Sequence, residues 1–247
     1  MADQNGSRTL QLLWGLRKPP TRGPRPALSV SQIGQTAVTI ADAEGLGAVS
    51  MQRVAGELDF TKMSLYRYVA GKAELIAVMI EEAVGDPPDL GAVAGDWREK
   101  LTTWAQLLWE TWDRHQWLPA ATEGTRLMGP KEAGWVEAAL RSLHRTGLTD
   151  AEQLAVVRLI SGHIRNTQST RRAGTGLDPA QFGSEFSSVL ADHGDEYPAL
   201  LAASKSPVTL DIRSFGLARI IHGVSQLIEE RTPKDVPGGA GGSGDGG

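Results

Sequence analysis

Hydrophobic residues recur at spacings of three and four along most of the chain, which is the pattern of amphipathic α-helices. No stretch shows the strict alternation of a half-buried strand. We therefore expect an all-α protein of about nine or ten helices. The longest periodic segments predict helices over residues 29–44, 97–115, 130–146, 151–169 and 211–231, with one or two more in 181–203 interrupted at Pro198.

The segment after the first of these helices is organised differently, as two short helices joined by a tight turn. Val54 and Leu58 are four residues apart and share one face of the first short helix. Ser50 and Thr61 stand where a side-chain oxygen can cap each helix. Asp59 lies at the turn and is one of the few residues that tolerate a left-handed backbone. The segment is thus predicted to be a helix-turn-helix, whose second helix enters the DNA major groove.

Local signals at the helix starts support this division of the chain. Ser29 and Gln32 have the spacing of a capping box, which places the first helix start at residue 29. Hydrophobic staples are expected before three consecutive helices, in the pairs Leu28 with Ile33, Val49 with Val54, and Phe60 with Leu65. A fourth helix should run from about Lys72 to Val84, before a break rich in Pro and Gly.

The second helix of the motif carries Lys62, Arg67 and Lys72 and no acidic residue, although the whole chain has a net charge of −4. Lys62 and Ser64 lie near its start, where side chains reach base edges, and Arg67 pairs well with guanine. Tyrosine hydroxyls and the remaining basic groups are suited to phosphates. The candidate DNA-binding residues of the motif are Ser50, Gln52, Arg53, Thr61, Lys62, Ser64, Tyr66, Arg67, Tyr68 and Lys72.

Over Pro26 to Val84 the sequence resembles the tetracycline-repressor (TetR) family of transcription regulators, most closely in TKMSLYRYVAGKAEL after VAGELDF. It departs from the family at Asp59, where a Gly is usual, but Asp adopts the same backbone at a small cost. Beyond Val84 the resemblance is architectural only. It implies a three-helix DNA-binding domain at residues 29–84, followed by a larger helical domain for effector binding and dimerisation at residues 97–231.

The two ends of the chain differ from this helical body. Residues 1–28 hold five basic residues and one acidic residue, a net charge of +4, whereas residues 29–82 carry −3 and residues 83–247 carry −5. This proline-rich arm is expected to be extended, either as a solvated tail or with Arg22 and Arg25 in the minor groove. The apolar segment LQLLWGL within it either docks on the body or is disordered. Residues 232–247 are Gly-rich and expected to be disordered.

Composition excludes several other kinds of chemistry. The absence of cysteine excludes disulfides and thiolate sites, and the five histidines show no metal-ligand spacing. No catalytic motif is present, so we expect no enzyme, no cofactor and no metal ion. No apolar run is long enough for a membrane span, and no signal-peptide core is present, so a cytoplasmic protein is expected.

Five of the seven tryptophans lie between Trp97 and Trp117. These aromatic side chains are interpreted either as an ordinary helical core or as the wall of an effector pocket, since such pockets are largely apolar and aromatic. The two interpretations are compatible. The candidate ligand-binding residues are Trp104, Leu108, Trp112, Trp135 and His163.

The helices at 151–169 and 211–231 carry more apolar residues than one inward face requires. Paired across a two-fold axis they would form a four-helix bundle, so a homodimer is expected. The candidate interface residues are Leu154, Val157, Ile164, Ile220, Val224 and Leu227.

The function expected from these features is a repressor, released from double-stranded palindromic DNA when a small apolar or aromatic effector binds. Two alternatives remain at this stage. The protein could be an activator or a ligand-independent regulator of the same fold. It could also be an enzyme or carrier that uses the tryptophan-lined cavity.

Overall fold

The computed structural model describes residues 2–16, 28–124, 126–173, 184–205 and 210–231. Within these ranges the chain forms twelve α-helices and two short 3-10 helices, with no strand. The all-α prediction is therefore confirmed. Two helices beyond the expected nine or ten are α1 (Ala2–Leu13) and α7 (Leu118–Ala121).

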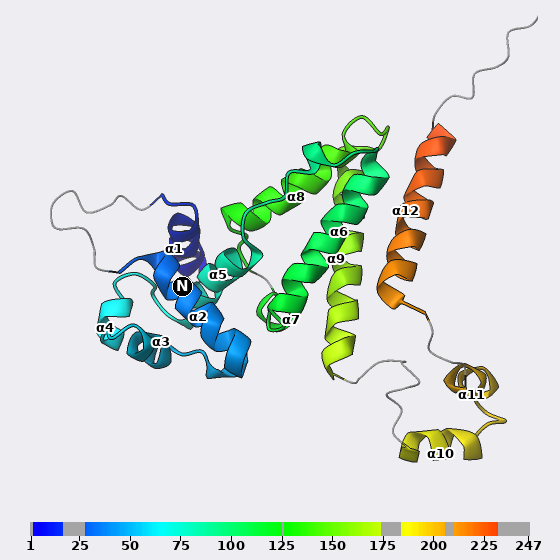
Figure 1. Cartoon of the computed structure of the whole chain (residues 1–247), viewed down its shortest axis with the longest axis horizontal. Helices are drawn as coiled ribbons and strands as arrows, with labels where there is room; N and C mark the ends of the chain where they lie inside the picture. Colours follow the sequence, from blue (N-terminus) through cyan, green and yellow to red (C-terminus); the bar gives the residue numbers. More distant parts are fainter. Residues whose placement is uncertain (1, 17–27, 125, 174–183, 206–209, 232–247) are drawn as a thin grey trace, which may run out of the picture.

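The part of the chain predicted to bind DNA, called the DNA-binding head below, consists of α2 (Val30–Glu44), α3 (Met51–Glu57), α4 (Lys62–Leu65) and α5 (Lys72–Val84) (Figure 1). Helix α2 packs against α5, and Gly34 permits their close approach because a Cβ there would lie 2.7 Å from the Val78 side chain. The predicted capping box is formed, with Ser29 accepting from the Gln32 amide and Gln32 accepting from the Ser29 amide. The buried core of the head comprises Leu28, Ile33, Val49, Val54, Leu65, Val69, Leu75, Val78 and Met79.

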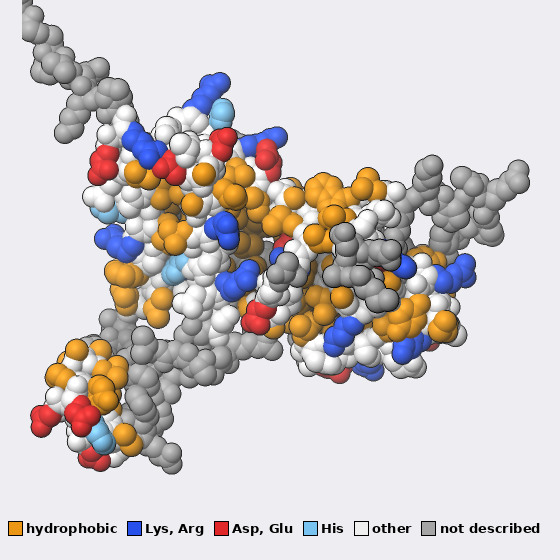
Figure 2. All heavy atoms as spheres, turned by 180° about the vertical axis from the view of Figure 1, so that it is seen from behind, with side chains coloured by type: hydrophobic (Ala, Val, Ile, Leu, Met, Phe, Trp, Pro, Cys, Tyr) orange, Lys and Arg blue, Asp and Glu red, His pale blue; other side chains and the backbone are white. Residues whose placement is uncertain are grey.

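The second domain is built on α6 (Trp97–Arg114), which packs against α8 (Pro130–Leu143) and α9 (Asp150–Ala173). Helix α12 (Ile212–Arg231) lies along α9 on the side away from the DNA-binding head (Figure 1). The short helices α10 (Ser184–Asp192) and α11 (Pro198–Ser204) form a pair set apart from this body. Figure 2 shows hydrophobic side chains on the surface of that pair, where Val189 and Tyr197 are exposed.

The N-terminal segment differs from the expected extended arm. Residues Ala2–Leu13 form helix α1, which packs against α5 beside the DNA-binding head (Figure 1). Its partly buried Leu12 and Leu13 contact the core, so the apolar segment docks on the body. A helix is possible here because the first proline of the chain, Pro19, lies beyond this segment.

The second helix of the motif is shorter than expected. Its α-helical part is Lys62–Leu65, and hydrogen-bonded turns carry the chain from Tyr66 to Val69. Of the two residues predicted to form the staple at this helix, Leu65 is fully buried and Phe60 is 36% exposed.

Candidate nucleic-acid interface and effector domain

The turn between α3 and α4 is fixed by its own side chains and backbone. The Ser50 hydroxyl accepts from the Arg53 amide at 3.1 Å, and the Thr61 hydroxyl accepts from the Ser64 amide at 3.2 Å. Asp59 has the expected left-handed backbone, with φ 57°. These bonds satisfy amides at each helix start that have no partner within the helix. The orientation of α4 relative to α3 therefore follows from the local sequence.

Helix α4 divides into a buried and an exposed face. Leu65 and, in the following turn, Val69 point into the core of the head. Lys62 and Arg67 are exposed on the other side, with Ser64 half-buried beside them. The Lys62 ammonium lies 5.8 Å from the centre of the Tyr66 ring, which follows the end of α4. The exposed face thus presents two cations to a polyanion.

Met63 was not among the residues predicted to contact DNA, yet it is the most exposed large hydrophobic side chain at this surface, with 73% exposed. It lies between Lys62 and Ser64 at the first turn of α4. An apolar side chain at the start of a recognition helix is suited to the methyl group of thymine. The sequence contained one signal for a role of Met63: it lies in a helix without acidic residues, next to the predicted base contact Lys62.

Arg53, predicted to contact a phosphate, has acidic partners in this structure. Its guanidinium lies 2.9 Å from Glu44 and 3.0 Å from Glu57. Gln52 and Lys72 are exposed. A phosphate contact by Arg53 would have to replace or share these ion pairs. Arg22 and Arg25 lie outside the described residues.

The predicted ligand-binding tryptophans occupy the core of the second domain. Trp104 is 1% exposed and donates its indole N–H to the Trp135 carbonyl at 2.9 Å. Trp135 in turn donates to the Gly85 carbonyl at 3.3 Å, at the end of α5. Leu108 and Trp112 are also buried. In this conformation the four side chains pack as a core that reaches the base of the DNA-binding head.

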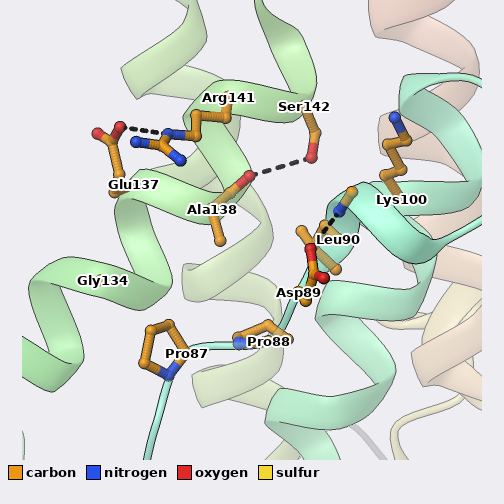
Figure 3. A pocket seen from close by; sticks show the side chains of 11 residues that line it. Pro87, Pro88, Asp89, Leu90, Lys100, Gly134, Glu137, Ala138, Arg141 and Ser142 are labelled. Carbon is orange, nitrogen blue, oxygen red and sulfur yellow. Dashed lines mark hydrogen bonds and ion pairs between the residues drawn. The ribbon is translucent and has the colours of Figure 1, made fainter.

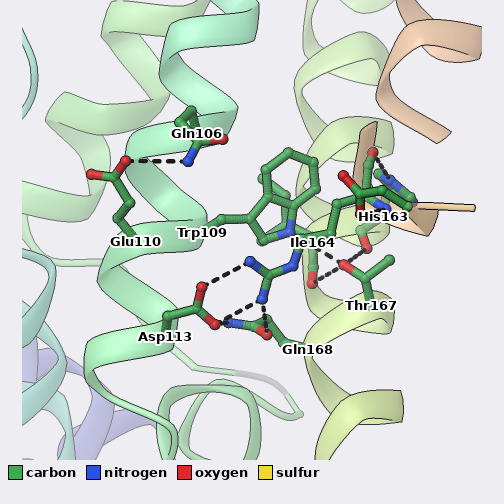
Figure 4. A network of polar contacts seen from close by, with 10 residues as sticks. Gln106, Trp109, Glu110, Asp113, His163, Ile164, Thr167 and Gln168 are labelled. Carbon is green, nitrogen blue, oxygen red and sulfur yellow. Dashed lines mark hydrogen bonds and ion pairs between the residues drawn. The ribbon is translucent and has the colours of Figure 1, made fainter. Parts of the chain in front are cut away.

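His163, the fifth ligand candidate, belongs to a polar network that joins α6, α9 and α12 (Figure 4). Its Nε2–H donates to the Arg213 carbonyl at 3.0 Å, and its ring meets Trp109 edge-on at 5.7 Å. Arg213 binds both carboxylate oxygens of Asp113, at 2.7 and 2.8 Å, and this pairing raises the pKa of its guanidinium. Gly216 lets α12 approach, because a Cβ there would overlap with the His163 ring.

Three cavities lie elsewhere, and the five ligand candidates do not line them. The first, of about 350 Å³, lies between α8 and the linker after α5 (Figure 3). Pro87, Pro88 and the ion pair of Glu137 with Arg141 contribute to its walls. The second, of about 360 Å³, lies between α1, α5 and α7. A smaller polar one of about 240 Å³ lies where Asp42 faces Trp117.

Two carboxylates of the DNA-binding head accept hydrogen bonds from the second domain. The first is Asp42 on α2. His115 Nδ1 lies 2.9 Å from one Asp42 oxygen, and the Trp117 indole N–H donates to the same oxygen at 2.7 Å. Both donors are buried and follow directly after α6. This contact ties the first helix of the head to the α6–α7 connection.

The second carboxylate is Glu81 on α5, which is 7% exposed. It accepts from the amides of Lys131 at 2.8 Å and Glu132 at 3.2 Å, and so caps the start of α8. Burial is the main influence on this carboxyl and raises its pKa, while the two amides oppose that rise. Gly129 leaves room for this contact, because a Cβ there would overlap with the Glu81 carboxyl group and displace it.

The six candidate interface residues do not share one environment. Val157, Ile164 and Val224 are 2%, 0% and 8% exposed, so they pack inside the chain's own core. Ile220 and Leu227 are half-buried, and Leu154 is exposed. Among the described side chains of these two helices, the large apolar ones that are exposed are Leu154 and Leu159 on α9, and Ile212 and Phe215 on α12.

The described residues do not meet the requirements of two other kinds of site. No three His, Asp or Glu side chains among them lie close enough to bind a metal ion together. None of the described helices has both the length and the apolar character needed to cross a bilayer.

The chain is similar to a known protein family and to individual relatives. The family model described as "Tetracyclin repressor-like, C-terminal domain" matches residues 88–228. The HTH-type transcriptional repressor DrrR1 of Streptomyces coeruleorubidus is 35% identical over 246 residues, covering 94% of this chain and 90% of the relative. An HTH-type transcriptional regulator of Saccharopolyspora erythraea is 25% identical over 179 residues, covering 71% of this chain and 75% of the relative.

Solved structures show the same fold. Apo ActR of Streptomyces coelicolor superposes with a TM-score of 0.69 at 24% identity, covering 83% of this chain and 99% of that chain. ActR in complex with actinorhodin gives a TM-score of 0.66 at 24% identity, covering 81% of this chain and 96% of that chain. The helix-turn-helix head, the helical second domain and these matches agree, and the chain belongs to the TetR family of transcriptional regulators.

Proposed function

We propose that this protein is a homodimeric repressor that leaves a palindromic operator when a small apolar or aromatic molecule binds its second domain. The observation that carries the proposal is the pair of hydrogen-bonded contacts at Asp42 and Glu81, which join the DNA-binding head to α6, α7 and α8. A relative 35% identical over most of the chain is named a repressor, and structures of ActR hold small molecules. Both facts support the same proposal.

The proposed mechanism depends on the distance between two heads. Two recognition helices must lie about 34–36 Å apart to enter successive major grooves. An effector that binds only one arrangement of the second domain changes this distance through α5. The effector can shift the equilibrium between the two arrangements only by the ratio of its affinities for them, and this ratio limits the change in DNA affinity. The proposed effector contacts are Trp104, Leu108, Trp112, Trp135 and His163, which requires the packed core to open around a ligand.

Binding by a ligand can be tested without knowing the operator. A compound that enters the tryptophan-rich core should quench tryptophan fluorescence and raise the melting temperature, because it stabilises the native state. It should weaken DNA binding by the same factor by which DNA weakens binding of the compound. A compound that binds tightly but leaves DNA affinity unchanged would support the ligand-independent alternative.

The proposed DNA contacts predict two different kinds of loss. Lys62→Ala should remove a base contact and reduce discrimination by about 1–3 kcal/mol at one base pair. Lys72→Ala should remove a phosphate contact and weaken binding to all sequences alike. Titrations of both variants against the operator and single-base variants, at one salt concentration, distinguish these outcomes. If the two patterns were exchanged, the proposed position of α4 in the groove would be wrong.

Dimerisation is proposed through the exposed faces of α9 and α12, with Leu154, Leu159 and Phe215 at the contact and Ile220 and Leu227 beside it. Leu159 is 55% exposed in the single chain, so a charge there should leave the fold intact but prevent pairing. Leu159→Glu should therefore give folded monomers in analytical ultracentrifugation. Leu127→Glu, at a residue 38% exposed in the loop before α8, is the matched control and should stay dimeric. If Leu159→Glu stayed dimeric as the control does, this interface would be excluded.

A further inference from the structure

Helix α1 leaves an apolar cavity of about 360 Å³ between itself and the rest of the molecule. The cavity lies apart from the tryptophan-rich core. Its walls come from α1, α5, α7 and the loop after α7, and they consist of Gly6, Thr9, Ala73, Ile76, Ala77, Ile80, Ala121, Glu123, Arg126 and Leu127. The volume falls within the range of about 300–1,000 Å³ that is usual for small-molecule sites.

Helix α1 is attached to the body at separate points. Arg8 Nε lies 3.4 Å from the Glu74 carboxylate at the start of α5. Beyond the C-terminal end of α1, the Trp14 indole N–H donates to the Met128 carbonyl at 3.2 Å. The helix presents the small residues Gly6 and Thr9 to the cavity. The attachments hold the helix in place while its small residues leave the space beneath it open.

The walls define the chemistry of a ligand. The α5 face is apolar throughout, and Leu127 in the loop after α7 is 38% exposed. Two charged residues complete the wall. Arg126 makes paired hydrogen bonds to both oxygens of Glu132, so its charge is balanced. Within the described residues, no ion pair or hydrogen bond engages the Glu123 side chain, and it contributes an uncompensated negative charge.

We propose that this cavity binds a small molecule with an apolar ring-sized body and a protonated amine. The body would lie against Ile76, Ala77 and Leu127, and the amine would pair with Glu123. An amine is favoured over an acid because Glu123 repels an anion and Arg126 is already neutralised. The assignment is separate from the proposed contacts in the tryptophan-rich core.

The position of the cavity gives the ligand a regulatory role, a consequence that rests on the proposed function. Ile76 and Ala77 belong to α5 of the DNA-binding head, whereas Ala121 and Leu127 belong to the second domain. A molecule between them contacts both sides of the junction. It therefore binds differently when the head moves, and DNA affinity changes by the same factor.

The test uses dansylcadaverine, a fluorescent amine with an apolar ring system, and its N-acetyl derivative, which lacks the charge. Both are titrated into the full-length protein without DNA, and emission is recorded. The amine should bind more tightly than the acetylated probe. Glu123→Gln should weaken binding of the amine by about fivefold and leave binding of the acetylated probe unchanged, as expected for an ion pair with an exposed carboxylate. Glu110→Gln, at an exposed glutamate on α6, is the control and should change neither.

A second variant tests the location. Ala77→Phe should fill much of the cavity and weaken both probes more than tenfold, with the melting temperature showing that the variant is folded. Equal binding of either probe to the unaltered protein and to Ala77→Phe would overturn the site. Equal binding of the amine to the unaltered protein and to Glu123→Gln would overturn the assigned ligand class. Failure of the proposed function would appear separately, as absence of operator binding without any probe.

Discussion

Trp104→Ala should lower the free energy of unfolding by about 3–5 kcal/mol, the range for deleting a large buried aromatic side chain. The indole is 1% exposed and sits between α6 and α8, where its N–H donates to the Trp135 carbonyl. Truncation leaves a cavity between packed helices and removes the indole hydrogen bond to the Trp135 carbonyl, which keeps its partner within α8. Urea denaturation followed by circular dichroism measures the change.

Two further substitutions separate volume from hydrogen bonding. Trp104→Phe keeps an aromatic ring but removes the donor, so its cost should be about 1–3 kcal/mol. Trp14→Ala is the control, because Trp14 is 46% exposed and its removal should cost about 1 kcal/mol or less. A loss below about 1 kcal/mol for Trp104→Ala would mean that this side chain already borders an open pocket. The packed core described for the free protein would then be wrong.

Gly129→Ala should produce the second large effect, a loss of about 1–3 kcal/mol in unfolding free energy. The new methyl group would overlap with the Glu81 carboxyl group that caps α8, so the cap or the helix start must move. Because Glu81 lies on α5, the same change should alter the coupling between effector and DNA. Gly124→Ala is not a suitable control, since Gly124 has φ 78°. Gly47→Ala is suitable, because its Cβ would meet open space.

The Glu81 cap also predicts a pH dependence. Its pKa is raised in the folded protein, mainly by burial, above the ordinary 4.5 of the unfolded chain. Between those two pKa values the folded state binds more protons than the unfolded state. Stability should therefore fall as pH rises from 4.5 through the folded pKa. Glu81→Gln, which stays neutral but retains an accepting oxygen, should remove this contribution. An unchanged pH profile in the Glu81→Gln variant would exclude Glu81 as its source.

Features set by neighbouring residues could be predicted from the sequence. The Ser29–Gln32 capping box, the caps at Ser50 and Thr61, and the left-handed Asp59 depend on atoms within a few residues of one another. Their chemistry is therefore readable from spacing alone. The start of α6 has a second box, formed by Asp96 and Glu99. The helix-turn-helix followed from such signals.

Features that depend on distant residues could not be predicted in this way. Asp42 meets Trp117 across 75 positions, and Glu81 meets Lys131 across 50. A carboxylate at the end of a helix has no local sign that it will cross a domain junction. Periodicity also identifies an apolar face without showing whether it meets its own core or a second chain. For that reason Val157 and Ile164 were assigned to an interface but are buried within the chain.

The docking of α1 on the body also could not be predicted from the sequence. The sequence set LQLLWGL apart from the proline-rich part of the arm but left open whether it docks on the body or is disordered. The apolar run is too short to identify the surface on which it packs, and a helix over Ala2–Leu13 was not expected. The cavity beneath α1 depends on that docking and was likewise beyond prediction.

The central claim is that α4 reads a specific DNA sequence, and fluorescence anisotropy tests it most directly. Labelled duplexes that tile the DNA upstream of the gene are titrated with the unaltered protein at one fixed salt concentration, beside scrambled duplexes of equal composition. One duplex should bind at least about a thousandfold more tightly than its scrambled counterpart. Lys62→Ala should reduce that ratio. Equal affinity for the upstream and scrambled duplexes throughout would contradict sequence-specific repression at this locus.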